Sequence, residues 1–256
     1  MIVGAHTPGR DPLAEAAARR ADVVQIFLSN PQSWKKPLPR ADAPELAGSP
    51  TPIYVHSPYL INVCAANNRV RIPSRKILQE TCDAAVEIGA AAVVVHGGHV
   101  TGDGDVSEGF GRWRKALGQL DSDVPILIEN TAGGEKAVAR RIDQLKGLWE
   151  EVGGFGVGFV LDTCHAWAGG EPMDELVGRT MQATGRIDLV HLNDSRDPFD
   201  SRRDRHANLG AGEMAEADLA AVVREVDCPV IVETPGEAAD HAADIAWARQ
   251  VLSSTS

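Results

Sequence analysis

The chain lacks a hydrophobic run long enough to cross a membrane. Its longest uninterrupted stretch of apolar or small residues runs from Ile88 to Val95, whereas a spanning helix needs roughly 18 such residues. The first residues, MIVGAHTPGR, also lack the charged, apolar and cleavage regions of a signal peptide. We therefore expect a cytoplasmic protein that is neither secreted nor inserted into a membrane.

Cysteine and positive charge are both scarce. The four cysteines are widely spread and form no CxxC pair, being Cys64, Cys82, Cys164 and Cys228. This spacing excludes a disulfide framework and a zinc ribbon, and it fits a reducing compartment. Acidic residues outnumber basic ones by 36 to 25, which gives a formal charge of −11 at pH 7. On average, such a charge counts against unaided binding of nucleic acid, because phosphate contacts need lysine and arginine.

What the chain does have is a repeating pattern of a β-branched apolar run, a polar loop and an alanine-rich amphipathic stretch. The predicted strands are Ile2–Ala5, Val23–Leu28, Ile53–His56, Ala92–His96, Ile126–Glu129, Gly158–Asp162, Leu189–Leu192 and Val230–Glu233. The predicted helices are Leu13–Arg20, Arg75–Gly89, Gly109–Leu120, Glu135–Val152, Met173–Thr184, Glu216–Val226 and Asp240–Leu252.

Eight such units occupy about 32 residues each, the size of a βα repeat. Continuous apolar runs of this length are typical of strands buried on both faces, as in a parallel sheet. We therefore predict an α/β fold in which residues 1–256 form a single (β/α)8 barrel. A doubly wound open sheet is the alternative, but no GxGxxG motif follows the first strand as a dinucleotide site would require.

Ionisable side chains gather where the predicted strands end. Four carboxylates and five imidazoles lie at or just beyond six successive strands: His56, His96, Glu129, Asp162, His165, His191, Asp204, His206 and Glu233. In a barrel these strand ends converge on the face that carries the chemistry. Burying nine such groups together is costly unless cations offset them, and imidazole with carboxylate suits zinc, iron or manganese. At roughly three protein ligands per ion, the set predicts about three metal ions.

Several divalent ions close together suit the hydrolysis of a phosphoester. Two ions about 3.5–4 Å apart generate a nucleophile at neutral pH and stabilise the attacking and leaving oxygens. Basic residues follow the second, third and seventh strands: Lys35, Lys36, Arg40, Arg69, Arg71, Arg75, Lys76, Arg196, Arg202, Arg203 and Arg205. We therefore expect a polyanionic substrate despite the acidic overall charge.

The motifs around these residues resemble those of the endonuclease IV family, metal-dependent enzymes that act at apurinic/apyrimidinic (abasic) sites in DNA. They are NPQSW at Asn30–Trp34, HSPYLIN at His56–Asn62, ENTAGG at Glu129–Gly134, LDTCHAWAGG at Leu161–Gly170, HLNDSRDPFDSRRDRHANLGAG at His191–Gly212 and ETP at Glu233–Pro235. The resemblance runs nearly end to end. It implies a (β/α)8 barrel with its metal site at the C-terminal face of the strands.

The resemblance also implies a cluster of about three zinc ions, with manganese or iron as alternatives at some sites. His56, His96 and Glu129 would hold one ion, and Glu129 would bridge to a second. Asp162, His191 and Glu233 would complete the second site, while His165, Asp204 and His206 would hold the third ion. Glu129, Glu233, Asp162 and His165 are the expected catalytic residues among these ligands. Cys164 is interpreted as a packing residue.

The implied reaction is hydrolysis of the phosphodiester 5′ of an abasic site in duplex DNA. A hydroxide bridging the metals would attack phosphorus and leave a 3′-hydroxyl and a 5′-deoxyribose phosphate. Accessory 3′-phosphatase, 3′-phosphodiesterase and 3′→5′ exonuclease activities are further expectations. The resemblance implies a monomer with no obligate protein partner, associated with the nucleoid through its DNA substrate.

Substrate contacts are expected on the loops of the same face. Tyr59 and Leu60 match the family's inserting aromatic and aliphatic pair, which suits wedge side chains that unstack a base step. Gln32 stands where some members place an inserting arginine, and Arg205 is a further expected DNA contact. The residues expected to support the ligands are His6, Asn193 and Asp194, and His99 is expected nearby without being a tenth ligand.

Two other classes of function remain open from the residues alone. A barrel sugar isomerase or epimerase would use one or two metal ions and lack the loop ligands. This chain has both DTCH at Asp162–His165 and DRH at Asp204–His206, which counts against that class. A damage-binding protein without turnover would have lost a bridging ligand, whereas Glu129 is present.

Overall fold

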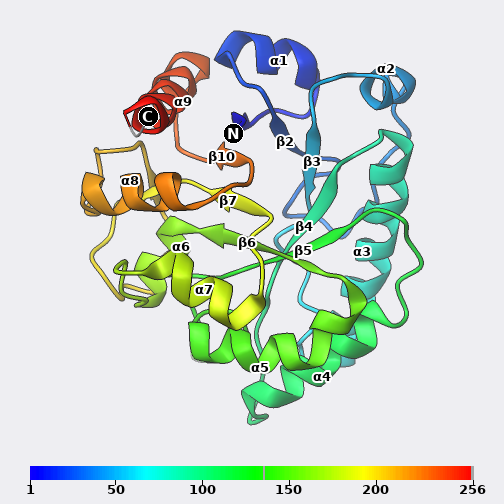
Figure 1. Cartoon of the computed structure of the whole chain (residues 1–256). Coiled ribbons are helices and arrows are strands. Elements are labelled where there is room, and N and C mark those ends of the chain that lie inside the picture. Colours follow the sequence, from blue (N-terminus) through cyan, green and yellow to red (C-terminus); the bar gives the residue numbers. More distant parts are fainter. Residues whose placement is uncertain (135, 255–256) are drawn as a thin grey trace.

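Eight parallel strands close into a barrel at the centre of the computed structural model, which describes residues 1–134 and 136–254 (Figure 1). They are β1 (Val3–His6), β2 (Val24–Phe27), β3 (Ile53–His56), β4 (Ala92–His96), β5 (Ile126–Glu129), β6 (Gly158–Asp162), β7 (Leu189–His191) and β10 (Val230–Val232). Strand β1 closes the ring by pairing in parallel with β10, with Val3 opposite Val230. The predicted (β/α)8 barrel is confirmed, and the open-sheet alternative is wrong.

Strict alternation along the strands sorts their side chains into an inner and an outer set. In β4, Val93 and Val95 point outward and pack in the main core with residues of the surrounding helices, such as Trp113 and Leu148. Val94, between them, belongs to a separate inner cluster that fills the barrel: Val23, Tyr54, Ala92, Val94, Leu127, Val160, Leu189 and Ile231. Successive side chains of a strand face opposite sides, so the residue two positions after each inner one also points into the barrel.

Helices surround the barrel, as Figure 1 shows. They are α1 (Pro12–Arg19), α2 (Ala43–Ala47), α3 (Asn68–Glu87), α4 (Val106–Leu117), α5 (Ile142–Val152), α6 (Thr163–Gly169), α7 (Leu176–Thr184), α8 (Glu216–Glu225) and α9 (Ala238–Ser253), with a 3₁₀ turn at Gly153–Phe155. Within the described residues, we find no helix with the length and apolar character that a membrane span requires.

Two of the predicted helices start seven residues away from where the structure has them, while the other starts agree within three residues. The helix predicted over Glu135–Val152 begins only at Ile142. Before it, residues 136–141 form turns that bond to the loop after β4, with the Val138 amide donating to the Gly98 carbonyl; residue 135 lies outside the described residues. The helix predicted from Arg75 begins seven residues earlier at Asn68, because the Asn67 side chain caps it by accepting from the Arg69 amide.

Besides the 3₁₀ turn at Gly153–Phe155, two helices and one hairpin were not predicted, and α6 and the hairpin shape the functional face. Helix α6 begins directly after Asp162, whose carboxylate caps it by accepting from the His165 amide at 2.6 Å. A small antiparallel hairpin of β8 (Asp194–Ser195) and β9 (His206–Ala207) stands beyond β7. The third is the short helix α2.

Candidate metal centre

Each barrel strand contributes one polar side chain to a layer that lies directly beyond the inner apolar cluster. This polar layer consists of His6, Gln25, His56, His96, Glu129, Asp162, His191 and Glu233. Most of its members stand two residues after an inner apolar residue, as His56 follows Tyr54 and Glu129 follows Leu127. Layers of inward side chains are how such barrels are filled. Six of the nine predicted ligands therefore share one level of the barrel.

Glu129 is fully buried at the middle of this layer and contacts four histidines. Its Oε2 lies 3.1 Å from Nε2 of His56 and 3.3 Å from Nε2 of His96. Its Oε1 lies 3.0 Å from Nδ1 of His191 and 3.2 Å from Nδ1 of His165. One carboxylate thus joins two groups of donors whose atoms lie mutually within 4.8 Å: His56, His96 and Glu129, and Glu129, Asp162, His191 and Glu233.

The remaining predicted ligands meet beside this layer. Oδ1 of Asp204 lies 3.1 Å from Nε2 of His165 and 3.1 Å from Nε2 of His206. Asp162 also approaches this group, since its Oδ2 lies 3.7 Å from Nε2 of His206. All nine predicted ligands are therefore brought together. Two of the mutually close donor sets are those that the resemblance implies, whereas around the third the sets are Asp162, His165 and His206, and Cys164, Asp204 and His206.

Cys164 lies close to the third group and offers its sulfur near Asp204 and His206. Burial, with the neighbouring carboxylate of Asp162, raises the pKa of this thiol to about 12. A neutral, fully buried thiol behaves as a small packing group. Cys164 therefore lies beside the predicted ligands. Its protonated thiol agrees with the interpretation of Cys164 as a packing residue.

Hydrogen bonds orient the rings of four of the five predicted ligand histidines. Nδ1 contacts the carbonyl oxygen of Ser57 in His56 (2.7 Å), of Asn130 in His165 (2.9 Å) and of Glu233 in His206 (3.1 Å), while Nε2 of His191 contacts the amide oxygen of Gln25 (3.0 Å). Donation from that nitrogen fixes the tautomer that leaves a lone pair on the other ring nitrogen. Within the described part of the chain, the buried Nε2 of His206 makes no hydrogen bond of good geometry, although Oδ1 of Asp204 lies 3.1 Å from it. Converging lone pairs and carboxylates of this kind fit divalent metal ions.

The carboxylates hold protons on the histidines while no cation is bound. Burial alone lowers the pKa of His191, but Glu233 and Glu129 outweigh it and raise that pKa to about 9. Burial likewise opposes the charge on His206, whose pKa Asp204 and Asp162 raise to about 9. Burial would raise the pKa of Glu129, yet His96 and His191 hold it well below its usual range. Metal ions and protons therefore compete for the same donors.

Gln25 is a member of the polar layer that sequence reasoning missed. Its Nε2 donates to Oε1 of Glu233 at 2.6 Å, and its Oε1 accepts from Nε2 of His191 at 3.0 Å. One fully buried amide thereby orients two predicted ligands of the same ion. The signal was present in the sequence, because Gln25 is the single polar residue of the predicted strand Val23–Leu28.

We expect Gln25→Leu to weaken zinc binding about 10- to 100-fold, the usual cost of losing a group that orients metal ligands. The leucine keeps the volume but neither donates to Glu233 nor accepts from His191. Zinc affinity is measured by competition with a chelator of known strength. Gln79→Leu is the matched control, since Gln79 hydrogen-bonds on α3 to Asp83 and Asp121, away from the barrel interior. Equal zinc affinities in the two variants would refute the orienting role.

Of the other residues expected near the site, His6 and Asn193 contact the predicted ligands, whereas His99 and Asp194 do not. Nδ1 of His6 lies 3.2 Å from Oε1 of Glu233. Asn193 donates to Oδ2 of Asp162 at 2.7 Å and accepts from the Glu233 amide at 2.8 Å, so it orients two ligands. His99 is exposed and lies in the loop after His96. Asp194 instead holds the loop after β9, because its carboxylate accepts from the amides of residues 210, 212 and 214.

Two of the predicted DNA contacts, Tyr59 and Leu60, line clefts that reach the predicted metal ligands. Tyr59 is 52% exposed, and its ring stacks on that of His96 with centroids 5.8 Å apart. It lies between two clefts, one of about 410 Å³ that reaches Glu233 and another of about 430 Å³ that reaches His96 and includes Leu60. Gln32 is exposed in the loop after β2.

Arg205 is less free for DNA than its sequence position indicates. Its Nε and Nη2 donate to the two oxygens of Asp197 at 2.7 and 2.5 Å. Arg203 contacts the same carboxylate at 3.4 Å. Because Asp197 is buried and shared, it offsets part of the positive charge that the sequence assigns to this loop.

Comparisons with known proteins agree on the fold and on one family. A family model described as a xylose isomerase-like TIM barrel matches residues 13–251. A probable endonuclease 4 of Mycobacterium ulcerans is 60% identical over 254 residues, covering 99% of this chain and 100% of that protein. The crystal structure of endonuclease IV from Thermus thermophilus has a TM-score of 0.85 at 30% identity and covers 99% of this chain and 100% of that one. A D-tagatose 3-epimerase-like protein has a TM-score of 0.80 over 100% of this chain and 99% of its own, but its 18% identity shows the shared fold alone.

Proposed function

Since the chain belongs to the endonuclease IV family of xylose isomerase-like TIM barrels and is a deoxyribonuclease of DNA repair, we propose that it hydrolyses the phosphodiester 5′ of abasic sites in duplex DNA. Water oxygen bonds to phosphorus and the P–O3′ bond breaks, which leaves a 3′-hydroxyl and a 5′-deoxyribose phosphate. The observation that carries the proposal is the convergence of nine donors around Glu129, whose two oxygens contact four histidines.

Three groups of side chains would hold the metal ions. His56, His96 and Glu129 form the first group, Glu129, Asp162, His191 and Glu233 the second, and His165, Asp204 and His206 the third. Bound divalent ions supply Lewis acidity, which lowers the pKa of water and stabilises charge on phosphoryl oxygens. We propose zinc at these sites, about three ions per chain, with manganese or iron able to replace it at some of them.

The other residues of the site orient these donors and receive the DNA. Gln25 and Asn193 fix the orientations of Glu233, His191 and Asp162 through the hydrogen bonds described above. Tyr59 and Leu60 enter the duplex at the lesion and keep the flipped abasic nucleotide out of the stack. Gln32 and Arg205 contact the strand nearby. We further propose 3′-phosphatase, 3′-phosphodiesterase and 3′→5′ exonuclease activities at the same centre, because each breaks a phosphoester at a 3′ end.

The same proposal covers the state of the protein. Residues 1–256 act as a single domain and as a monomer, without an obligate protein partner. Duplex DNA with an abasic site is the substrate, and the protein associates with the nucleoid through it.

Incision of a duplex with one abasic-site analogue, with metal content measured on the same sample, tests the proposal. We expect cleavage immediately 5′ of the lesion and close to three tightly held metal ions per chain. The proposal fails if the fully loaded protein leaves the duplex intact. A single bound ion in a fully active sample would reject the trinuclear arrangement but keep the nuclease.

A further inference from the structure

The arginines of the predicted DNA-contact loops are largely neutralised by carboxylates of the chain itself. Arg203 and Arg205 share Asp197. Arg40 binds Asp42, with Nε to Oδ1 at 2.9 Å and Nη2 to Oδ2 at 2.6 Å. These side chains present less positive charge to a polyanion than a count of the sequence indicates.

Positive charge without carboxylate partners also lies on the first half of α3. Arg71 donates to the carbonyl oxygens of Ala65 and Ala66 at 2.6 and 2.7 Å and to the side chain of Asn68. Arg75 donates to the amide oxygen of Gln119. Hydrogen bonds to neutral oxygens fix a guanidinium and leave its charge in place, and across residues 1–134 and 136–254 neither arginine makes an ion pair with a carboxylate.

Two further cations, Arg69 and Lys76, stand on the same stretch of α3, on a different side of the helix from Arg71 and Arg75. Arg69 is exposed in the first turn of the helix. Lys76 has a side chain that is 75% exposed and lies 3.9 Å from Glu80, a loose pair of the kind that contributes little. The cations also influence one another, since burial and the charges of Arg112 and Arg75 lower the pKa of Arg71. Arg69, Arg71, Arg75 and Lys76 are called the α3 surface below.

The α3 surface begins at the functional face. Helix α3 starts at Asn68, shortly after Tyr59 and Leu60, and its first turn lies at the end of the barrel where β3 finishes. From residue 69 to residue 76 a helix rises about 10 Å, enough to face about three successive phosphates of one DNA strand.

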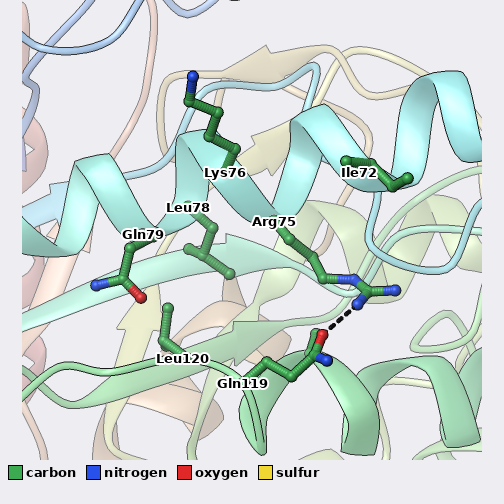
Figure 2. A pocket seen from close by; sticks show the side chains of 8 residues that line it. Ile72, Arg75, Lys76, Leu78, Gln79, Gln119 and Leu120 are labelled. Carbon is green, nitrogen blue, oxygen red and sulfur yellow. Dashed lines mark hydrogen bonds between the residues drawn. The ribbon is translucent and has the colours of Figure 1, made fainter.

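Figure 2 shows how Arg75 is held in this surface. Its side chain extends over a groove of about 300 Å³ between α3 and the end of α4 and reaches Gln119, whereas Lys76 points away from the groove. Leu78 and Leu120 line the groove beneath. Apolar packing of its stem and one hydrogen bond at its tip keep the guanidinium in a fixed place, as suits a site for phosphate oxygens.

We propose that the α3 surface binds the phosphate backbone of duplex DNA flanking the lesion, as a second contact area beside the metal centre. The inference rests on the proposed action on DNA. Such contacts carry no base preference and position the duplex. Such contacts also explain how a protein with a formal charge of −11 associates with DNA. Four cations on one helix attract phosphates locally, even though the net charge of the whole chain is negative. An acidic protein is the competing occupant of such a surface, and the test separates the two.

The test compares Arg69→Gln/Lys76→Gln with Lys146→Gln/Arg224→Gln in the metal-loaded protein. Both double variants remove two positive charges, but the control residues lie on α5 and α8. Arg71 and Arg75 are left in place because their hydrogen bonds support the loop before α3 and the end of α4. Binding to undamaged duplexes of about 12 and about 30 base pairs is followed as salt is raised, because each lost phosphate contact reduces the salt dependence by about one ion.

We expect the α3 variant to bind the longer duplex several-fold more weakly than the control, with a slope of log Kd against log salt smaller by about 2. Binding to the shorter duplex and the incision rate at saturating abasic DNA should match the control. Equal slopes for the two variants overturn the inference. If the α3 variant loses binding to a polyglutamate peptide while its slope of log Kd for DNA against log salt stays unchanged, the α3 surface binds acidic protein and the inference is overturned. Failure of the unmodified protein to incise would reject the proposed function, whereas an unchanged slope with normal incision rejects the α3 surface alone.

Discussion

The Glu129→Gln variant is expected to incise abasic duplex DNA on the order of 10³-fold more slowly than the unmodified protein. Glu129 is the one carboxylate whose two oxygens face both the His56/His96 pair and the His165/His191 pair. Glutamine has the same shape but no charge, and it replaces one acceptor oxygen with a donor. The fold should persist, while several kcal/mol of transition-state stabilisation from a shared metal ligand is lost.

Initial rates of incision, with zinc content determined on the same preparation, measure this effect. Glu171→Gln is the matched control: Glu171 is also a buried carboxylate, but it pairs with Arg141 and Arg179 away from the metal centre. That variant is expected to lose stability and keep its rate per folded molecule. A Glu129→Gln enzyme with normal turnover would show that Glu129 does not join the metal sites.

The metal-free protein is expected to lose stability as the pH rises from about 6.5 to 9. His191 and His206 have a pKa of about 9 in the folded chain, against about 6.5 in an unfolded one. Their protonated forms therefore stabilise the fold fully below pH 6.5, and that contribution disappears as the pH rises through 9. The loss is about 3 kcal/mol for either histidine alone. The two losses do not simply add, since both groups interact with Glu233 and Asp162.

Denaturant unfolding of the chelated protein at pH 6.5, 8 and 9.5, values chosen to bracket the two pKa values, measures this loss. The metal-loaded protein serves as one control, because bound ions have already displaced the protons and its stability should depend less on pH. The metal-free His206→Asn variant is the other, and it should lose less stability over the same interval. A metal-free protein whose stability is flat or increases toward pH 9.5 would show that the carboxylates do not hold these protons.

The barrel was predictable from the sequence because its strands are continuous β-branched runs that no surface helix would contain. Four of the eight strands have ends that differ from the prediction by one residue, but Ile53–His56, Ala92–His96, Ile126–Glu129 and Gly158–Asp162 were placed without error at both ends. The helix predicted from Glu135 shows the limit of periodicity. Its first residues have helical composition, yet hydrogen bonds to the loop after β4 hold them in turns, and contacts between distant segments leave no local signal.

The metal centre was predictable for the same reason, since ligands at strand ends need only the barrel to bring them together. Gln25 required one further step, the alternation that puts it in the same layer as His191 and Glu233. The pairing of Arg205 could not be predicted from the sequence, because only the folded loop brings its guanidinium against the carboxylate of Asp197. For the same reason, counting cations along the chain assigned four to the segment after the third strand and four to the segment after the seventh, and did not separate paired from unpaired charges.

Because of the hairpin of β8 and β9, the predicted ligands come from two kinds of structural element. Six predicted ligands stand on the barrel itself and are tied to the packing of the whole fold, and His165 follows one of them on α6. Asp204 and His206 instead belong to the excursion between β8 and β9, whose backbone bonds to the carbonyl oxygens of Trp167 and Ala168 on α6. Changes confined to that excursion can therefore remodel the third group of ligands while the strand-end ligands keep their places. For protein engineering, this makes the hairpin the natural segment to exchange when the number of ions in the barrel is to be altered.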